Sequence, residues 1–407
     1  MSLSNLKEKL IYFIIFSIFL ANFSVSNIGG RGFLIPELAI ALLIGINFIA
    51  KDNVKFILFF IILNMILSLL NVVNLTNNEF LKSYVLCIIY FSFVYITRST
   101  KNKDKALYYY TIGIKILVIF GILQFMVRLF GINFIESFVN NPFGGNTIGG
   151  NLELSYLGIF TRTNSLYYEP SIFGLVTLSS VAVLWYLKDI DSSYYKKSNI
   201  ILSYIGVIIS FSATALIGLA FLIILRIFLL KKINLKKIGF ILIGFITSVI
   251  IFINTQNRIS EIFKLGTSGY YRVIAPMKLI VSIIKDGYLF GIGIGQVENY
   301  IKLKDPIYMY KMGEFSWNLG LTIDNVLYMI IITFGFLSIV ILYIFLNFII
   351  INLNKRNIYI FIAFIFLLIG TGGYNFIYFN TILAVLLLIF DNERTKNEKI
   401  KYSDSNI

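Results

Sequence analysis

Long apolar runs recur along nearly the whole chain and are separated by short polar segments. Runs of about 17 to 25 residues are long enough to cross a hydrocarbon layer of roughly 30 Å as helices. Every backbone amide in such a layer needs a partner within the protein, so even a β-branched stretch such as 56–70 is predicted to be helical. Strands of a membrane barrel would instead show about 10 residues of alternating polarity. The pattern therefore predicts an all-α polytopic integral membrane protein.

The boundaries of the runs predict about 12 transmembrane helices within a single membrane domain, residues 1–407. The seventh and eighth spans are short. The predicted spans are residues 10–26, 33–50, 54–75, 80–97, 107–130, 169–187, 199–211, 213–230, 238–253, 322–347, 358–373 and 375–390.

Composition agrees with this pattern. The chain is 58% hydrophobic and 14% charged, with a mean hydropathy of +0.85, which is too apolar for one soluble core. Cys87 is the single cysteine and lies in an apolar run, so no disulfide framework or thiolate metal site is expected. The sequence has no histidine, which excludes a histidine-based triad and a histidine-ligated zinc. The first run resembles a signal peptide, but without a convincing cleavage site we expect a retained helix.

The net charge of +15 raises the question of a nucleic-acid partner, but the cations are arranged by topology. With a cytoplasmic amino terminus, the linkers on that side carry the cations and the short outside turns carry almost none. We therefore predict a multi-pass protein of the bacterial inner membrane with both termini cytoplasmic, including a tail at 391–407, and no nucleic-acid partner. The inside cations are Lys51, Lys55, Arg98, Lys101, Lys103, Lys105, Lys188, Lys196, Lys197, Lys231, Lys232, Lys236, Lys237, Lys355, Arg356, Arg394, Lys396, Lys399 and Lys401.

Two outside segments are long. Residues 132–168 hold several glycines and asparagines and read as a turn-rich, mobile loop. Residues 254–321 contain stretches, 277–284 and 289–294, that are apolar enough to lie on or dip into the membrane. We predict two long periplasmic loops with short helices, and long loops carry function more often than short ones.

The first loop ends in a run that contains Arg162, Glu169 and Pro170. One interpretation is structural, because Pro170 suits a first helical turn and Glu169 would face the positive end of that helix. The other is functional: a carboxylate beside an arginine at the membrane surface can accept a proton or bind a sugar hydroxyl.

The second loop carries more cations than carboxylates. Long loops escape the orientation rule, so one interpretation gives this excess no function; the other is that the loop binds an anionic group. Guanidinium groups match phosphate oxygens well, and Arg272 is the preferred phosphate ligand, with Arg258 nearby in sequence. The glycines after Arg272 lack the rest of a dinucleotide fingerprint, so we expect close backbone packing or a bend there. They are Gly291, Gly293 and Gly295.

Polar residues elsewhere have simpler interpretations. Asp324 and Asn325 open a late span that is broken by Gly335, and Asp324 is read either as a helix cap or as a catalytic carboxylate. A tight turn explains the polar break at 212–214. Asp189 and Asp191 resemble the metal-binding pair of many sugar transferases, but beside Lys188 they are predicted to be solvated loop charges.

Taken together, these residues resemble the O-antigen polymerase and ligase superfamily of bacterial inner-membrane proteins. The matching features are Arg162 with Glu169-Pro170-Ser171, the 212–214 turn, Arg272 before the three glycines, and Asp324-Asn325 at the start of a span. The resemblance covers the span plan of the whole chain, but each motif is short. It implies a GT-C-like fold and polymerisation of O-antigen or capsular repeat units carried on undecaprenyl diphosphate. The implied transfer takes place on the periplasmic face without metal or cofactor.

The resemblance also implies roles for the candidate residues. Arg272, with Arg162 and Arg258, would hold the donor diphosphate, and Glu169 or Asp324 would take the acceptor proton. Pro170, Asn325 and the three glycines would shape the site. Ligases of this superfamily commonly have a histidine where this chain has Asp324, which disfavours a ligase. A flippase of lipid-linked sugars is the rival from another class, and membrane lipid and a chain-length regulator protein are the other partners considered.

Overall fold

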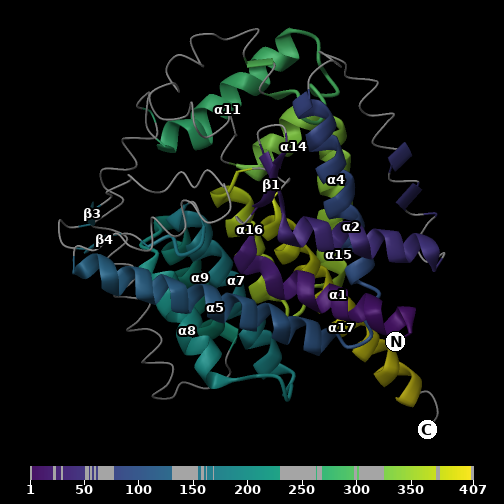
Figure 1. Cartoon of the computed structure of the whole chain (residues 1–407), viewed down its shortest axis with the longest axis vertical. Helices are drawn as coiled ribbons and strands as arrows, with labels where there is room; N and C mark the ends of the chain where they lie inside the picture. Colours follow the sequence, from purple (N-terminus) through teal and green to yellow (C-terminus); the bar gives the residue numbers. More distant parts are fainter. Residues whose placement is uncertain are drawn as a thin grey trace.

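The computed structural model describes residues 2–21, 24–28, 31–50, 55, 57–58, 61–62, 78–130, 155–156, 160–161, 163–167, 169–229, 263, 268–297, 300–301, 325–372 and 376–404. Helices dominate this part of the chain, and its strands form two short hairpins (Figure 1). The helices are α1 (Leu3–Phe16), η1 (Ser17–Leu20), α2 (Ile35–Ile49), α4 (Asn78–Thr97), α5 (Lys103–Leu129), α7 (Pro170–Asp189), α8 (Lys197–Ile209), α9 (Ala213–Leu229), α11 (Ser268–Lys285), α14 (Val326–Phe334), α15 (Leu337–Asn352), α16 (Ile358–Gly370) and α17 (Ile377–Asp404).

Helix α7 forms the centre of the packed helices. Its residues from Ser171 to Leu187 are all buried, and it packs against α5, α8, α9 and α16. Its sequence mixes large apolar side chains with small ones such as Gly174, Ser179 and Ser180, which lets neighbouring helices approach closely. Glu169, which precedes α7, is therefore attached to a helix that is held on several sides.

Several predicted spans match described helices within a few residues, and others need correction. Residues 24–26, predicted to end the first span, belong to β1 (Ser24–Ile28), which pairs antiparallel with β2 (Arg31–Leu34). The span predicted at 322–347 is two helices, α14 and α15, because the chain turns at Gly335 with a φ of +51°. Helix α17 continues to Asp404, so most of the predicted tail is helical. The spans at 54–75 and 238–253 lie almost wholly outside the described residues.

The helix surfaces have a strongly apolar outer side. Along α15, the exposed residues include Ile339, Val340, Ile344, Ile350 and Ile351. Helices α5 and α7 are long and apolar enough to cross a membrane, with α7 mostly enclosed by other helices. Six further apolar stretches of helix are shorter: Ile35–Ile49, Ser83–Thr97, Lys197–Ile209, Ala213–Leu229, Leu337–Asn352 and Ile358–Gly370. These features indicate a helical membrane protein, and the number of spans stays a prediction.

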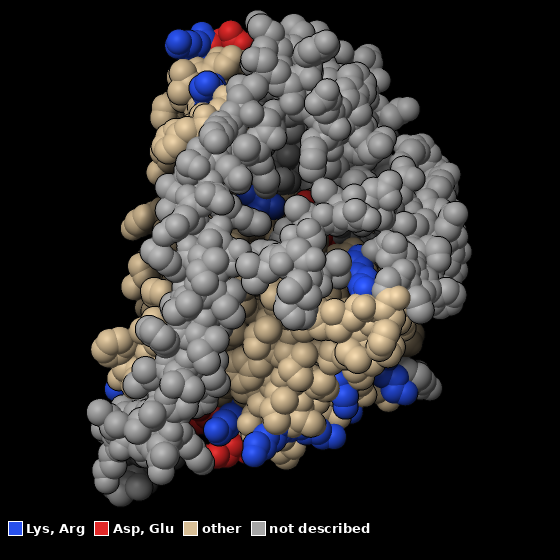
Figure 2. Space-filling view, turned by 90° about the vertical axis from the view of Figure 1, so that its left-hand side faces the viewer, with Lys and Arg blue, Asp and Glu red and all other residues tan. Residues whose placement is uncertain are grey.

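Segments that the charge pattern places on one side of the membrane gather at one end of the structure. The backbone N–H of Lys101 donates to Glu8, and Asn392 donates to Asp104. The side chain of Asn354 donates to Glu393, which is buried. On one face of the molecule, Lys and Arg side chains collect along the lower edge (Figure 2), and both ends of the chain lie at the lower right of Figure 1.

Asp189 is paired, and the prediction of a solvated loop charge is wrong for it. Its two carboxylate oxygens accept from the two terminal nitrogens of Arg226 in the last turn of α9, and these side chains are 21% and 12% exposed. The guanidinium also lies over the rings of Trp185 and Tyr359. Local sequence pattern does not reveal this pairing because the two residues lie 37 positions apart.

We expect replacement of Arg226 by glutamine to destabilise the protein, because it leaves the Asp189 carboxylate partly buried and without its cation. The expected loss is about 2 kcal/mol, below the range for fully buried pairs. The measurement is thermal unfolding of the purified protein, with the exposed Arg356→Gln variant as control. The double variant with Asp189→Asn should recover part of the loss. Equal melting temperatures for Arg226→Gln and Arg356→Gln would contradict a stabilising role for the pair.

Candidate functional site

Glu169 stands immediately before the first turn of α7. Its backbone is extended, and Pro170 occupies the first helical position, where a missing N–H costs no hydrogen bond. The Glu169 side chain does not cap the helix; its Oε2 accepts from the hydroxyl of Ser171 at 2.7 Å. The positive end of α7 favours the ionised carboxylate at this place. The predicted helix start at this position is confirmed.

Arg272 lies in the second turn of α11 and forms an ion pair with Glu169. Its Nη2 is 3.4 Å from Glu169 Oε2, although the two residues are 103 positions apart in the sequence. The side chains are 24% and 26% exposed, respectively, so the pair is accessible from outside. The separation exceeds that of a strong charge-assisted bond, about 2.8 Å. The structure thus brings together the preferred phosphate ligand and one of the two candidate bases.

Three other candidate residues, Arg162, Arg258 and Asp324, lie outside the described residues. Asn325 is described and caps α14: its Oδ1 accepts from the backbone N–H groups of Leu327 at 3.0 Å and Tyr328 at 3.4 Å. The helix cap expected at Asp324 is therefore supplied by its neighbour. Two of the first backbone N–H groups of α14 therefore have a hydrogen-bond acceptor in Asn325 and do not need the Asp324 carboxylate.

The glycines after α11 pack against the end of α14, as expected from close backbone packing. The N–H groups of Ile292 and Gly293 donate to the carbonyls of Ile332 and Thr333, at 3.0 and 3.1 Å. A Cβ on Gly291 would lie 2.3 Å from the Thr333 carbonyl oxygen, and φ is +81° there. A side chain at this position is excluded on both counts. Gly293 and Gly295 also have positive φ, so the segment follows a path that favours glycine.

A tyrosine braces the far end of α11. The hydroxyl of Tyr300 donates to Asp286 at 2.6 Å and lies 3.1 Å from the Ser282 hydroxyl. Burial, and then the hydrogen bond to Asp286, raise the pKa of Tyr300 to about 12. Tyr300 also packs edge-on against Tyr288. These contacts fix the exit of α11, and the glycine pairing fixes the segment after it, so α11 is anchored to α14 beyond its C-terminal end.

A buried polar segment, residues 163–167, leads to Glu169. The backbone N–H of Ser165 donates to Gln124 Oε1 at 2.7 Å, its hydroxyl donates to the Leu117 carbonyl at 2.6 Å, and its φ is +53°. Gln124 also donates to Asn164, and all five residues of the segment are at most 6% exposed. The prediction of a mobile loop over 132–168 is wrong for these residues. The other described part of that loop is the hairpin of β3 (Ser155–Tyr156) and β4 (Phe160–Thr161).

The sequence held one signal for this segment. Gln124 is a polar residue well inside the apolar run of α5, and such a residue needs a buried partner. Its partners are Asn164 and Ser165, 40 and 41 positions away. Sequence reasoning treated the Thr-Asn-Ser run only as a connection between Arg162 and Glu169, and so missed it.

Breaks between helices surround this segment. The carbonyl of Ile209, the last residue of α8, accepts from the Thr163 N–H at 3.3 Å. The predicted turn at 212–214 is confirmed: α8 ends at Ile209 and α9 begins at Ala213, with a positive φ at Phe211. The Tyr167 ring lies 5.9 Å from that of Tyr378, at the start of α17. The end of α8 and the start of α17 thus contact the buried polar segment that precedes Glu169.

Comparison with known proteins assigns the family. The family model described as WcaD colanic acid polymerase matches residues 10–390, almost the whole chain. The chain belongs to the WcaD colanic acid polymerase family. A relative from Escherichia coli (strain K12), named "Putative colanic acid polymerase", is 25% identical over 186 residues. The match spans 44% of this chain and 42% of the relative, less than half of either protein.

Membership of the WcaD family confirms the resemblance to bacterial polysaccharide polymerases drawn from the sequence. Its model covers both Glu169 and Arg272, together with α7, α11, α14 and the glycine segment. The site therefore lies within the region that defines the family.

Replacement of Gly291 by alanine tests the pairing of the glycine segment with α14. We expect a loss of stability well above 1 kcal/mol, because strain from the positive φ adds to a clash with a carbonyl. Gly287→Ala is the matched control: φ is +85° there, but nothing lies within 4 Å of the added Cβ. The loss of stability in Gly287→Ala measures the backbone strain alone, and the additional loss in Gly291→Ala measures the clash with the Thr333 carbonyl. Thermal unfolding of both variants gives the two losses. Equal losses would show that the close approach contributes nothing.

Proposed function

We propose that this protein is a glycosyltransferase that joins polysaccharide repeat units carried on undecaprenyl diphosphate, on the periplasmic face of a bacterial inner membrane. Family membership supports polymerisation of a polysaccharide. The observation that carries the finer proposal is the ion pair between Arg272 and Glu169, a partly buried guanidinium held beside a carboxylate.

Arg272 is the proposed ligand of the donor diphosphate. A guanidinium presents paired N–H donors that match phosphate oxygens, and it stays charged at any physiological pH. The 3.4 Å contact with Glu169 is longer than a strong charge-assisted hydrogen bond, so its exchange for a contact with a diphosphate costs little. As the glycosidic bond breaks, negative charge grows on the diphosphate, and a fixed cation lowers the energy of that state. Arg162 and Arg258 are proposed as further ligands from the same two loops.

Glu169 is the proposed acceptor of the proton. The hydroxyl oxygen of the acceptor sugar attacks the anomeric carbon of the donor, and the bond from that carbon to the diphosphate oxygen breaks. The diphosphate leaves with the bonding electron pair, and the hydroxyl proton passes to a carboxylate. Ser171 keeps a hydrogen bond to Glu169, so the carboxylate stays in place when Arg272 turns to the diphosphate. Asp324 is the alternative base, and the cap supplied by Asn325 is consistent with that role.

The gathering of the basic linkers at one end supports a multi-pass arrangement with Glu169 and Arg272 near the opposite face. Glu169 precedes the first residue of α7, and Asp189 is its last residue, at the end where the basic linker 188–197 begins. A helix of 20 residues spans roughly 30 Å, about the thickness of a hydrocarbon core. This arrangement supports the proposed location of the site on the periplasmic side.

Substitutions at the ion pair test the proposed chemistry. In a polymerisation assay with purified lipid-linked repeat units, Arg272→Ala should lower the rate by about 100-fold or more, because one charge-stabilising group is lost. Glu169→Gln keeps the shape and the Ser171 partner but cannot take the proton, and a loss of about 100-fold or more is expected. In cells, single repeat units should accumulate while long glycan disappears.

The matched control is Lys285→Ala, which removes an exposed cation from the other end of the same helix. It should keep the wild-type rate. Normal chain length in Arg272→Ala, with the variant present in the membrane at wild-type level, would refute the assignment. Polymer made only when an ion gradient is imposed would instead favour a transporter.

The single buried cysteine makes the topology directly testable. In a Cys87→Ser background, a cysteine replaces Lys285 in one variant and Lys101 in another. A membrane-impermeant maleimide applied to spheroplasts should label the first variant at once, and the second only after permeabilisation. Labelling of both variants, or of neither, in sealed spheroplasts would contradict the proposed orientation.

A further inference from the structure

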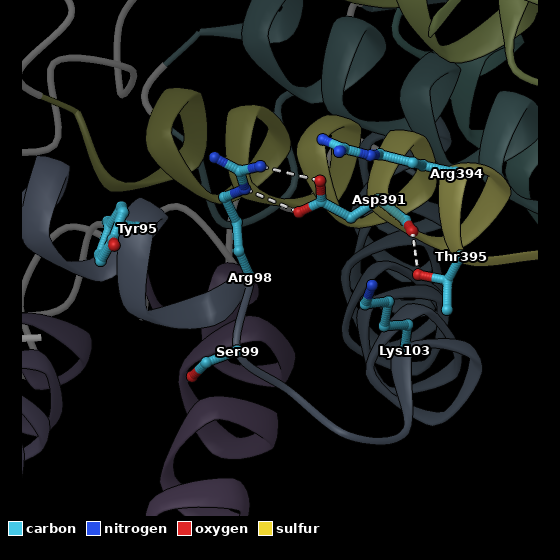
Figure 3. A pocket seen from close by; sticks show the side chains of 7 residues that line it. All are labelled: Tyr95, Arg98, Ser99, Lys103, Asp391, Arg394 and Thr395. Atoms are coloured by element: carbon cyan, nitrogen blue, oxygen red, sulfur yellow. Dashed lines mark hydrogen bonds and ion pairs between the residues drawn. The ribbon is translucent and has the colours of Figure 1, made fainter. Parts of the chain in front are cut away.

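A polar cavity of about 430 Å³ lies at the end of the molecule opposite Glu169. It is formed by the last turn of α4 and the residues after it, the start of α5, and the middle of α17 (Figure 3). Three lining side chains are cationic, Arg98, Lys103 and Arg394, and one is acidic, Asp391. The formal charge of the lining is therefore positive. The proposed transfer reaction uses none of these residues.

Arg98 and Asp391 form a rigid wall of the cavity. Arg98 Nε and Nη2 donate to the two carboxylate oxygens at 2.7 and 2.8 Å. These hydrogen bonds raise the pKa of Arg98 above its ordinary value. A guanidinium has five N–H donors, and this fork uses only part of them. Among the described residues, Nη1 donates no hydrogen bond, and the Arg98 side chain is 36% exposed. Donors therefore remain available on an arginine whose position is fixed.

Lys103 supplies a second cation. Lys103 extends from the first residue of α5 and Arg394 from α17, on either side of the Arg98–Asp391 pair (Figure 3). Within the part of the chain that the structure describes, the Lys103 ammonium makes no hydrogen bond. The Asp391 carboxylate is already occupied by the Arg98 fork, so it offsets only part of the positive charge. The cavity thus presents cationic donors in excess of its own acceptors.

The surroundings indicate which anion fits. Ser99 and Thr395 also line the cavity, but their hydroxyls already donate to backbone carbonyls at 2.7 Å. The donors that remain for an anion are therefore those of the cationic side chains. The Arg98 guanidinium lies 5.7 Å from the centre of the Phe348 ring, and Tyr95 lines the cavity from α4. Cations beside aromatic rings at the ends of apolar helices are typical of lipid headgroup level. Basic pockets between membrane helices on this side bind anionic headgroups.

We propose that this cavity binds a phosphate oxyanion on Arg98 and Lys103, with Arg394 adding positive charge to the lining, and that an anionic phospholipid headgroup is its source. The cavity is several times larger than the roughly 30 Å³ share of a water molecule, so it holds a phosphate together with the glycerol attached to it. The phosphate chemistry follows from the lining alone. The lipid source rests on the membrane setting of the proposed function.

The test uses the full chain, purified and placed in nanodiscs that contain phosphatidylcholine with or without phosphatidylglycerol. Phosphatidylglycerol should raise the melting temperature of the wild-type protein, and native mass spectrometry should show it retained. In Lys103→Glu, which reverses one charge and leaves the Arg98–Asp391 pair in place, its affinity should fall by about tenfold or more. Lys188→Ala removes an exposed cation at the same end, outside the cavity, and should match the wild type.

A titration with inorganic phosphate distinguishes the sources. Phosphate that stabilises the wild-type protein in phosphatidylcholine, but not Lys103→Glu, would support the same chemistry with a soluble ligand. Equal retention of phosphatidylglycerol by wild type and Lys103→Glu, with no response to phosphate, would overturn the proposal, as would equal losses in Lys103→Glu and Lys188→Ala. These readouts need no polymerisation, so they stand apart from the outcome for Arg272.

Discussion

The ion pair between Glu169 and Arg272 connects the two halves on which the proposed site depends. Glu169 begins α7, which is buried along its length, and Ser171 and the positive end of that helix hold its carboxylate. Arg272 belongs to α11, whose exit is anchored to α14 through the glycine segment. The carboxylate thus has other attractions besides the arginine. Under the proposed function, the carboxylate therefore keeps its place when Arg272 binds a diphosphate.

A second constraint governs the residues around this pair. Backbone N–H and C=O groups inside an apolar bundle need partners, and a non-helical segment cannot supply them from within. Residues 163–167 meet this requirement through side chains and helix ends: Gln124 accepts from the Ser165 N–H, and the last carbonyl of α8 accepts from the Thr163 N–H. The polar composition of the segment is therefore explained by its own burial. Asn164 and Ser165 hold this segment in place through their hydrogen bonds, and under the proposed function the chemistry belongs to Glu169 and Arg272.

The sequence predicted the features that depend on local pattern and failed where distant contacts decide. Runs of apolar residues predicted α4, α5, α7, α8 and α9 within a few residues, because a helix in an apolar surrounding satisfies its own amides. They marked Gly335 as a break but kept 322–347 as one span, since the close approach of the segment after α11 to Gly335 cannot be read from local pattern.

The candidate site shows the same division. Arg272 and Glu169 were chosen singly, for charge and for place before a helix, and the structure brings them together. The helix cap could not be assigned from the sequence: Asp324 and Asn325 are neighbours with similar capping ability, and the geometry of α14 shows that Asn325 is the cap. The same holds for Asp189, whose partner on α9 is invisible in the sequence around it.

Helix length gives a physical reason for placing the chemistry at Glu169. Helices α8 and α16 each have 13 residues and reach roughly 20 Å, short of the roughly 30 Å of a hydrocarbon core. Because these helices are short, polar groups at their ends and in residues 163–167 lie among apolar side chains close to Glu169, where they are hydrogen-bonded to one another. An arginine near such a place attracts a diphosphate more strongly than it would in water, because the effective dielectric constant is lower. Under the proposed function, this surrounding strengthens the attraction of Arg272 for the leaving diphosphate while the lipid tail stays among the apolar helix faces.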